Sequence, residues 1–173
     1  MGALRVVDDD NGSEQRRNAQ LAAAQWPDEP TATADADLMR PAGNKPGKVR
    51  SYQEKFPNGQ TQARWSGAVA KDGRFLLQGR EQWWFASGQP HYEANYELGR
   101  KVGTESLWRE DGSFLWRREH QADGSTVWTQ FWEDGTKKSE SNWRNFKADG
   151  PARLWGLDGK LTSEVEFSGG VLR

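Results

Sequence analysis

The sequence predicts an all-β protein, in which five tandem β-hairpin repeats of about 23–24 residues stack into an elongated, curved antiparallel sheet. Three observations indicate this fold. Turn-forming glycines recur at a nearly constant interval, the segments beside them alternate between two kinds of residue, and the apolar residues are largely aromatic, with 10 Trp and 7 Phe but 2 Met. Self-similarity at such a short period is typical of repeat arrays, whose units bury their faces only against their neighbours.

Five glycines mark the tight turn of each predicted unit. They are separated by 29, 24, 23 and 24 residues, so the first unit carries about five additional residues. Pro57 and Asn58, like the Asp residues at matching places, suit a type I turn, and glycine suits the left-handed third position of a three-residue hairpin loop. Each unit therefore predicts a strand, a tight turn and a second strand. The turn glycines are Gly59, Gly88, Gly112, Gly135 and Gly159.

The predicted loop also assigns residues to the two faces of the sheet. A residue four positions before a turn glycine is expected on the same face as residues two, four, six and eight positions after it. That face alternates aromatic with small residues, as a packed core requires, whereas the opposite face of each second strand is charged. The expected core row is Trp84, Trp108, Phe131 and Trp155 on the first strands, with Tyr96, Trp143 and Phe167 on the second strands.

Residues 1–47 differ in composition and predict an N-terminal arm and linker ahead of a repeat domain at 48–173. The arm has eight acidic and five basic residues, and Trp26 is its single aromatic residue. Such a segment buries too little apolar surface to offset the entropy lost on ordering, so we expect it to be flexible. A short helix is expected at about 13–26, where Ala, Gln and Arg are frequent. An arm that docks on the sheet through Leu21 and Trp26 is the alternative.

Two units show the repeat pattern most fully. One reads Phe131-Trp-Glu-Asp-Gly-Thr-Lys-Lys-Ser-Glu-Ser-Asn-Trp143 with Gly150 closing it, and another begins Gln82-Trp-Trp-Phe-Ala-Ser-Gly88. This pattern resembles the MORN-type repeat, in the variant found in the bacterial YwqK-like antitoxin family, over about residues 48–173. It departs from that variant in the long first unit and at Arg109 and Gly156, which replace the second aromatic residue. The resemblance implies stacked hairpins and roles in scaffolding, membrane-proximal assembly or toxin neutralisation, and it implies no catalytic residue.

Composition and motifs argue against catalysis and against nucleic acid. The chain has no Cys, which excludes disulfides, Cys-ligated zinc and a thiol nucleophile. Residues 48–173 carry 19 basic and 17 acidic groups without a long basic run, so no phosphate-tracking surface is expected. His91 and His120 lie in different units and on opposite predicted faces, which argues against a metal site. No nucleophile elbow, P-loop or dinucleotide motif is present, so we expect no enzyme, no cofactor and no metal.

Two other sequence features have structural explanations. Six Asp-Gly pairs are explained by turn geometry, because they lack the alternating Asp spacing of an EF-hand. No stretch is apolar enough for a signal peptide or a membrane span, so we expect a cytoplasmic chain.

Aromatic residues outside the expected core row predict a binding surface. By parity they lie among charged residues, and exposed aromatics beside Arg and Glu are typical of protein-interface hot spots. We therefore expect a protein-interaction module, toxin-neutralising or scaffolding, with Arg109, Arg117 and Glu119 orienting the partner. The alternatives are carbohydrate or cell-wall binding through exposed Trp, and a structural subunit anchored in a larger assembly by the N-terminal arm. The candidate partner-binding residues are Phe56, Trp83, Phe85, Arg109, Trp128 and Trp132.

Overall fold

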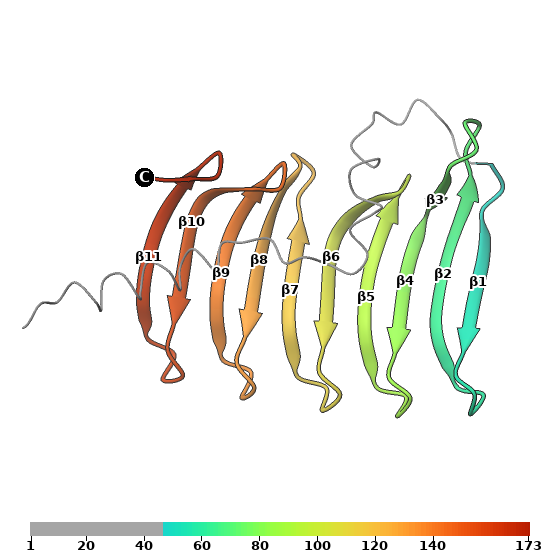
Figure 1. Cartoon of the computed structure of the whole chain (residues 1–173), viewed down its shortest axis with the longest axis horizontal. Coiled ribbons are helices and arrows are strands. Elements are labelled where there is room, and N and C mark those ends of the chain that lie inside the picture. The colour runs from blue at the N-terminus through green and yellow to red at the C-terminus, as the bar shows by residue number, and fades with distance from the viewer. Residues whose placement is uncertain (1–46) are drawn as a thin grey trace, which may run out of the picture.

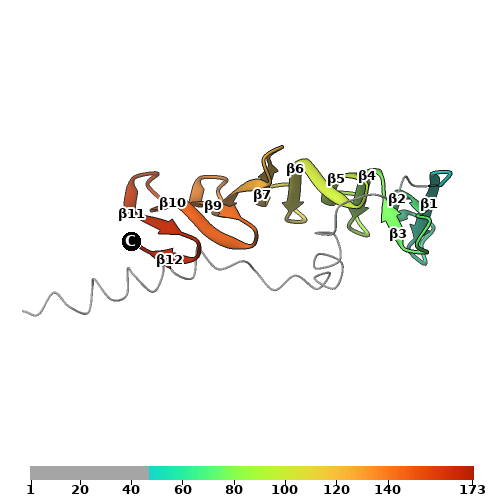
Figure 2. The same ribbon diagram turned by 90° about the horizontal axis from the view of Figure 1, so that it is seen from above.

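The computed structural model describes residues 47–173, which form one antiparallel sheet of twelve strands and contain no helix. The strands lie side by side in chain order, except that β3 branches from β2, and the sheet is open, elongated and curved (Figure 1, Figure 2). The predicted hairpin array is therefore confirmed. The arm and its helix at about 13–26 lie outside the described residues, so both stay predictions, as does the boundary after residue 47.

The five predicted units correspond to five strand pairs, each joined by a tight turn at the lower edge of the sheet in Figure 1. The additional residues of the first unit form β3, whose Phe75 ring covers the backbone of Gly67. The strands are β1 (Arg50–Lys55), β2 (Thr61–Val69), β3 (Phe75–Leu77), β4 (Gly79–Trp84), β5 (Pro90–Glu97), β6 (Arg100–Trp108), β7 (Phe114–His120), β8 (Ser125–Phe131), β9 (Lys137–Arg144), β10 (Lys147–Trp155), β11 (Leu161–Ser168) and β12 (Val171–Leu172).

The tight turns have the geometry that the sequence predicts. In the fourth unit the Gly135 amide donates to the Trp132 carbonyl at 3.0 Å, and the Trp132 amide donates to the Thr136 carbonyl at 2.8 Å. Gly135 has a φ of 82°, a left-handed conformation that strains any residue with a side chain. The carboxylate of Asp134 accepts from the Thr136 amide at 2.9 Å, which explains why a short polar residue precedes the glycine.

Every hairpin also contains a β-bulge just after the turn, which the turn pattern did not predict. Trp84 pairs with Pro90 and Trp83 pairs with Tyr92, so the ladder skips His91. One extra residue in a strand inverts the alternation of side chains relative to the partner strand. The bulge therefore exchanges the two faces of each first strand. The skipped residues of the five hairpins are Gln62, His91, Leu115, Lys138 and Thr162.

As a result, the expected core is right for the second strands and wrong for the first strands. Tyr96, Trp143 and Phe167 are buried, as expected. On the first strands the buried aromatic residue is Trp128 instead, at 5% exposure. The expected first-strand core residues are half-buried on the opposite face, where Trp84 lies beside the guanidinium of Arg64 and Trp155 beside the ammonium of Lys137. These residues are Trp84, Trp108, Phe131 and Trp155.

We call the two faces of the sheet inner and outer. The inner face carries the buried second-strand positions, and the outer face carries charged ones that form ion pairs, such as Arg153 with Glu164 at 2.8 Å. The inner positions six residues after each turn glycine are Trp65, Ala94, Arg118, Ser141 and Val165, and the outer positions five residues after it are Arg64, Glu93, Arg117, Glu140 and Glu164.

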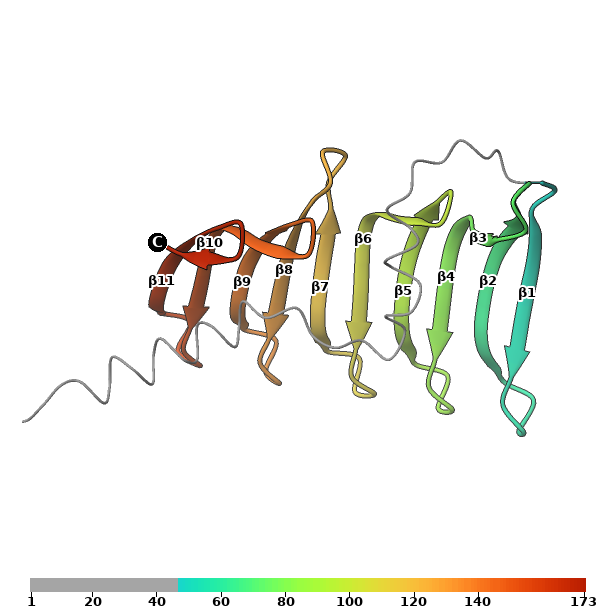
Figure 3. The same cartoon turned by 45° about the horizontal axis from the view of Figure 1, so that its top comes forward.

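A second set of glycines turns the upper ends of the strands across the inner face. Gly103 and Gly150 have positive φ angles of 64° and 113°, and they stand opposite His120 and Phe167. Ahead of these glycines, the first residues of β6 and β10 run across the top of the sheet (Figure 2, Figure 3). Because these segments shield the inner face from water, the large side chains beneath them are buried.

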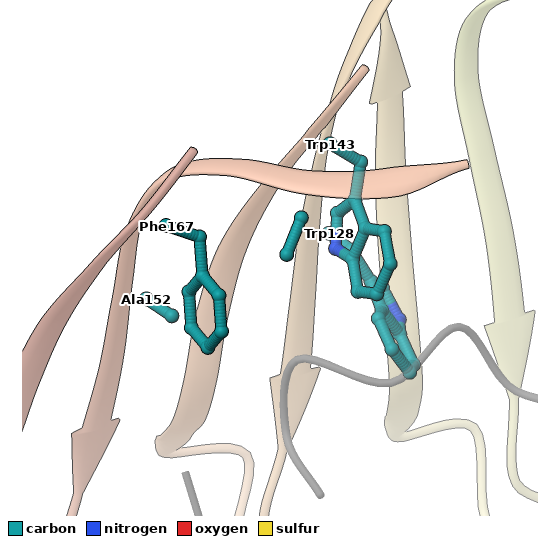
Figure 4. Close-up of a cluster of buried hydrophobic side chains, with 5 residues drawn as sticks. Trp128, Trp143, Ala152 and Phe167 are labelled. Atoms are coloured by element: carbon teal, nitrogen blue, oxygen red, sulfur yellow. The ribbon is translucent and has the colours of Figure 1, made fainter. Parts of the chain in front are cut away.

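The hydrophobic core lies under the overhanging start of β10 (Figure 4). Trp128 and Trp143 pack with their ring centroids 6.2 Å apart, and the indole of Trp143 donates to the Ser141 hydroxyl at 2.8 Å. Phe167 fills the space over Ala152, where a larger residue would not fit the alternation of large and small side chains. The C-terminal half of the inner face is thus closed by its own side chains.

Candidate functional site

Of the six candidate residues, Trp83 and Trp128 lie within strands, where the bulge places them on the inner face rather than the outer one, and the other four stand three positions before their turn glycine, outside the strands. The six candidates therefore lie in different places. They do not form one platform. Trp128 belongs to the buried core, so its predicted exposure on the charged face is wrong. The others divide between the open N-terminal end of the inner face and the row of turns along the lower edge.

The lower-edge candidates hold neighbouring hairpins together. Arg109 donates to the Phe131 carbonyl of the next hairpin at 2.9 Å, and the Trp132 indole donates to the Trp155 carbonyl of the hairpin after that at 3.2 Å. Such bonds fix the spacing of adjacent units, which is a structural role. Phe56 and Phe85 are half-buried at the equivalent places.

The bulge residues pack on this lower-edge row. The ring of His91 lies 4.2 Å from that of Phe85, and the ammonium of Lys138 lies 4.6 Å from the ring centre of Trp132. Burial lowers the pKa of His91, which favours the neutral imidazole against the Phe85 ring. These aromatic residues are thus partly covered by contacts within the chain.

The N-terminal end of the inner face is different, because large aromatic side chains gather there and remain partly exposed. Tyr52 stacks on Trp65 with ring centroids 5.7 Å apart and meets Phe75 edge-on at 5.6 Å. Trp83 is 37% exposed and meets Tyr92 edge-on at 6.2 Å. We call Tyr52, Trp65, Phe75 and Trp83 the N-terminal aromatic cluster. Trp83 was predicted as a binding residue and Trp65 as part of the packed face, whereas Tyr52 and Phe75 were not predicted in either role.

A shallow pocket of about 280 Å³ opens at this cluster. Trp65 and Trp83 line it, and two carboxylates, those of Glu54 and Glu81, line it as well. The indole of Trp83 donates to Glu81 at 2.8 Å, which orients both groups. The remaining lining residues are Gln62, Ala63 and Leu77.

A buried charged network occupies the centre of the inner face. Glu105 and Arg118 are both fully buried and face each other across β6 and β7, with 3.6 Å between Arg118 Nη1 and Glu105 Oε2. The other carboxylate oxygen accepts from Tyr92 and Lys101, each at 2.7 Å. The guanidinium lies against two indoles, 4.5 Å from the ring centre of Trp116 and 5.1 Å from that of Trp128.

The sequence contained a signal for this network that parity reasoning obscured. Glu105 occupies the repeat position that holds Trp128 in the next unit, and Arg118 occupies the position of Ser141. The third unit thus has two charged residues at positions where the fourth unit has an aromatic and a small residue, which indicates that these two charges interact with each other. Counting alternate residues from the turn glycine without the bulge puts Glu105 on the opposite face from Arg118, so the pattern does not show that they are paired.

The network sets the protonation of its members. Burial alone would raise the pKa of Glu105, but the hydrogen bond with His120 and the charges of Lys101 and Arg118 outweigh it and bring the pKa from 4.5 down to about 2. Burial and the Glu105 carboxylate raise the pKa of the Tyr92 phenol, so this phenol remains a donor. His120 Nε2 lies 2.8 Å from Glu105 and Nδ1 lies 3.2 Å from the Thr126 hydroxyl.

We expect this network to make the fold sensitive to acid. A carboxyl whose pKa is lower in the folded state than in the unfolded state stabilises the fold above its unfolded pKa, and this contribution is lost as the pH falls through the folded pKa. For Glu105 the window runs from pH 4.5 down to about pH 2. Across this pH range, the difference in free energy of unfolding between the unmodified chain and the Glu105→Gln variant should decrease by on the order of 3 kcal/mol. Urea unfolding at a series of pH values measures this, and a gap that stays constant would contradict the assignment.

The predicted orienting charges lie elsewhere. Arg117 and Glu119 occupy the outer face and pair with each other at 2.7 Å, and Glu119 also accepts from the Thr104 hydroxyl at 2.8 Å. They cannot act together with inner-face aromatics on one flat partner surface. Among residues 47–173, no group of three or more His, Asp or Glu side chains is arranged to hold a metal ion. The same part of the chain has no helix of the length and apolarity needed to cross a membrane.

The geometry defines an open, single-layer β-hairpin repeat protein with a charged outer face and an aromatic inner face. Residues 77–98, which run from the end of β3 through β5, match the family model of the MORN repeat variant, and this supports MORN-type repeats in the chain. A solved structure of the GtfA/B complex bound to UDP and GlcNAc is 15% identical to the chain, with a TM-score of 0.27. The match covers 92% of this chain and 38% of that one. Comparison with curated proteins found no match.

Proposed function

We propose that the chain is a non-enzymatic protein-interaction module that binds its partner through the N-terminal aromatic cluster. The observation that carries this proposal is the exposure of Tyr52, Phe75 and Trp83 on one face, where Tyr52 contacts Phe75 and Trp83 lines the pocket with Trp65. Large aromatic side chains that stay partly exposed on a rigid sheet are the usual anchors of protein interfaces. MORN-type repeats agree with a repeat-based interaction module, and we propose toxin neutralisation or scaffolding as its specific role.

The remainder of the surface is less suited to this function. The outer face is occupied by ion pairs such as Arg80 with Glu93 and Arg153 with Glu164, so these charged groups already have partners within the chain. The C-terminal half of the inner face is packed against itself around Trp128. The N-terminal cluster thus combines apolar area with rigidity, because its strands are held by the continuous ladder from β1 to β5.

Two adjacent residues on opposite faces offer a matched test. Trp83→Ser removes an inner-face anchor, whereas Trp84→Ser removes an outer-face indole that lies 5.7 Å from the Arg64 guanidinium. After affinity purification identifies the partner, Trp83→Ser should weaken its binding by about 2 kcal/mol or more, roughly 30-fold. Isothermal titration calorimetry measures the affinity, and thermal melts confirm that both variants are folded. Equal losses for the two variants, or full affinity in Trp83→Ser, would reject the inner face as the binding surface.

A further inference from the structure

The pocket at the N-terminal aromatic cluster contains negative charge without a matching cation. Glu54 is exposed and Glu81 is half-buried, and both line the same hollow. Within residues 47–173, neither carboxylate forms an ion pair with a lysine, arginine or histidine, although other inner-face and outer-face carboxylates do. The charge of Glu81 is also felt by its neighbour, because burial and then the Glu81 carboxylate raise the pKa of Tyr96.

In the next repeat unit, a carboxylate at the same repeat position as Glu81 is paired with an arginine. Glu105 stands at the repeat position of Glu81, seven residues before the turn glycine. The residue paired with Glu105 is Arg118, whose guanidinium lies between the indoles of Trp116 and Trp128. Carboxylate and indole together stabilise a guanidinium by charge-assisted hydrogen bonding and by cation–π attraction.

In the pocket at the N-terminal aromatic cluster, the chain itself does not supply a cation to match the carboxylates. None of the lining residues is a lysine, arginine or histidine, and the residue paired with Glu81, Ala94, is fully buried, has no functional group and does not line the pocket. The two indoles and the carboxylates remain, from Trp65, Trp83, Glu54 and Glu81. The volume of about 280 Å³ lies below the roughly 300–1,000 Å³ of typical small-molecule sites, which suits one side chain rather than a whole ligand.

We infer that this pocket receives an arginine side chain of the partner protein, held by its two indoles and two carboxylates, which are groups of the same kinds as the indoles and the one carboxylate beside Arg118 within the chain. The inference rests on the proposed function, whose anchor it specifies. Charge complementarity favours this occupant over a neutral one, since a neutral group would leave both carboxylates uncompensated. The planar guanidinium suits indole stacking better than a compact ammonium does.

The test uses the full chain labelled with ¹⁵N, whose indole N–H signals are assigned by single Trp→Phe variants. It is titrated with the tripeptide acetyl-Gly-Arg-Gly-amide and, separately, with the same peptide containing citrulline, a neutral group of the same shape. We expect the arginine peptide to shift the Trp65 and Trp83 signals in a saturable way and the citrulline peptide to bind about tenfold more weakly or worse, because it lacks the charge.

Two variants check the role of the carboxylates. Glu54→Gln removes an exposed pocket charge without touching the core, and it should weaken binding of the arginine peptide about tenfold. Glu133→Gln removes an exposed turn charge far from the pocket and should leave binding unchanged. Equal binding of the arginine and citrulline peptides, shifts caused by an N-acetylglucosamine disaccharide in place of arginine, or no saturable shift at all would each overturn the inference.

The result can be separated from that of the proposed function. If the arginine peptide fails to bind while Trp83→Ser still weakens the partner complex, the interaction face stands and the arginine anchor is wrong. If Trp83→Ser leaves the partner complex intact, the proposed function itself fails, whatever the peptide does.

Discussion

Replacing Trp128 with alanine is expected to lower the free energy of unfolding by about 3–5 kcal/mol, the range for removal of a large buried aromatic side chain. Trp128 is 5% exposed and packs against Trp143 and the guanidinium of Arg118. Its loss opens a cavity between the central charged network and the C-terminal core. Because repeat units are stabilised by their neighbours, the whole array should lose stability, rather than one hairpin.

Urea unfolding followed by far-ultraviolet circular dichroism measures this effect. Trp108→Ala is the matched control, because the face assignment made from sequence expected Trp108 in the core, whereas the structure leaves it half-buried on the outer face against Phe114. The control should cost clearly less than Trp128→Ala, as partly exposed sites do. A larger effect at Trp108 would restore the face assignment made from sequence and contradict the bulge.

The second large effect is expected at Glu105. Glu105→Leu removes the carboxylate from Arg118, Lys101 and His120 at once and should cost about 3–5 kcal/mol, the usual result of breaking a buried ion pair from one side. The double variant Glu105→Leu with Arg118→Met replaces both charges by apolar groups of similar size. It should recover most of the loss, because burying charge is itself costly.

A double-mutant cycle built from these variants and the Arg118→Met single variant measures the coupling between the two residues. Strong coupling is expected for groups that face each other when both are fully buried. If the double variant is as unstable as the sum of the single variants, the two charges act independently and the network has been misassigned. Recovery of stability in the double variant would instead indicate that the buried pair specifies how the strands pack and adds little to the free energy of unfolding.

Only part of the candidate site could be predicted from the sequence. Trp83 was identified as a binding candidate, and it does lie partly exposed at the pocket. Its companions were not identified, because Tyr52 and Trp65 come from the first hairpin and Phe75 comes from the inserted strand. No periodicity within one unit brings these residues together; the pairing of β2 with β1, β3 and β4 does.

The sequence by itself determined the architecture, because each turn depends on neighbours along the chain. Gly135 with Asp134 specifies its turn through bonds that span a few residues, and the same is true at the other four turn glycines. The alternation of Tyr96 and Ala94, or of Trp143 and Ser141, likewise identified the buried face of each second strand from local period alone.

Tertiary structure decided which face the first strands bury. The bulge at His91 or Lys138 adds one unpaired residue to the second strand of its hairpin, and the sequence of the turn does not predict it. Because side chains alternate with a period of two, this single residue moves Trp128 into the core and Trp84 out of it. It also brings Glu105 opposite Arg118 and leaves Glu81 opposite Ala94, so both the buried network and the open pocket depend on pairing between strands rather than on the order of residues within one.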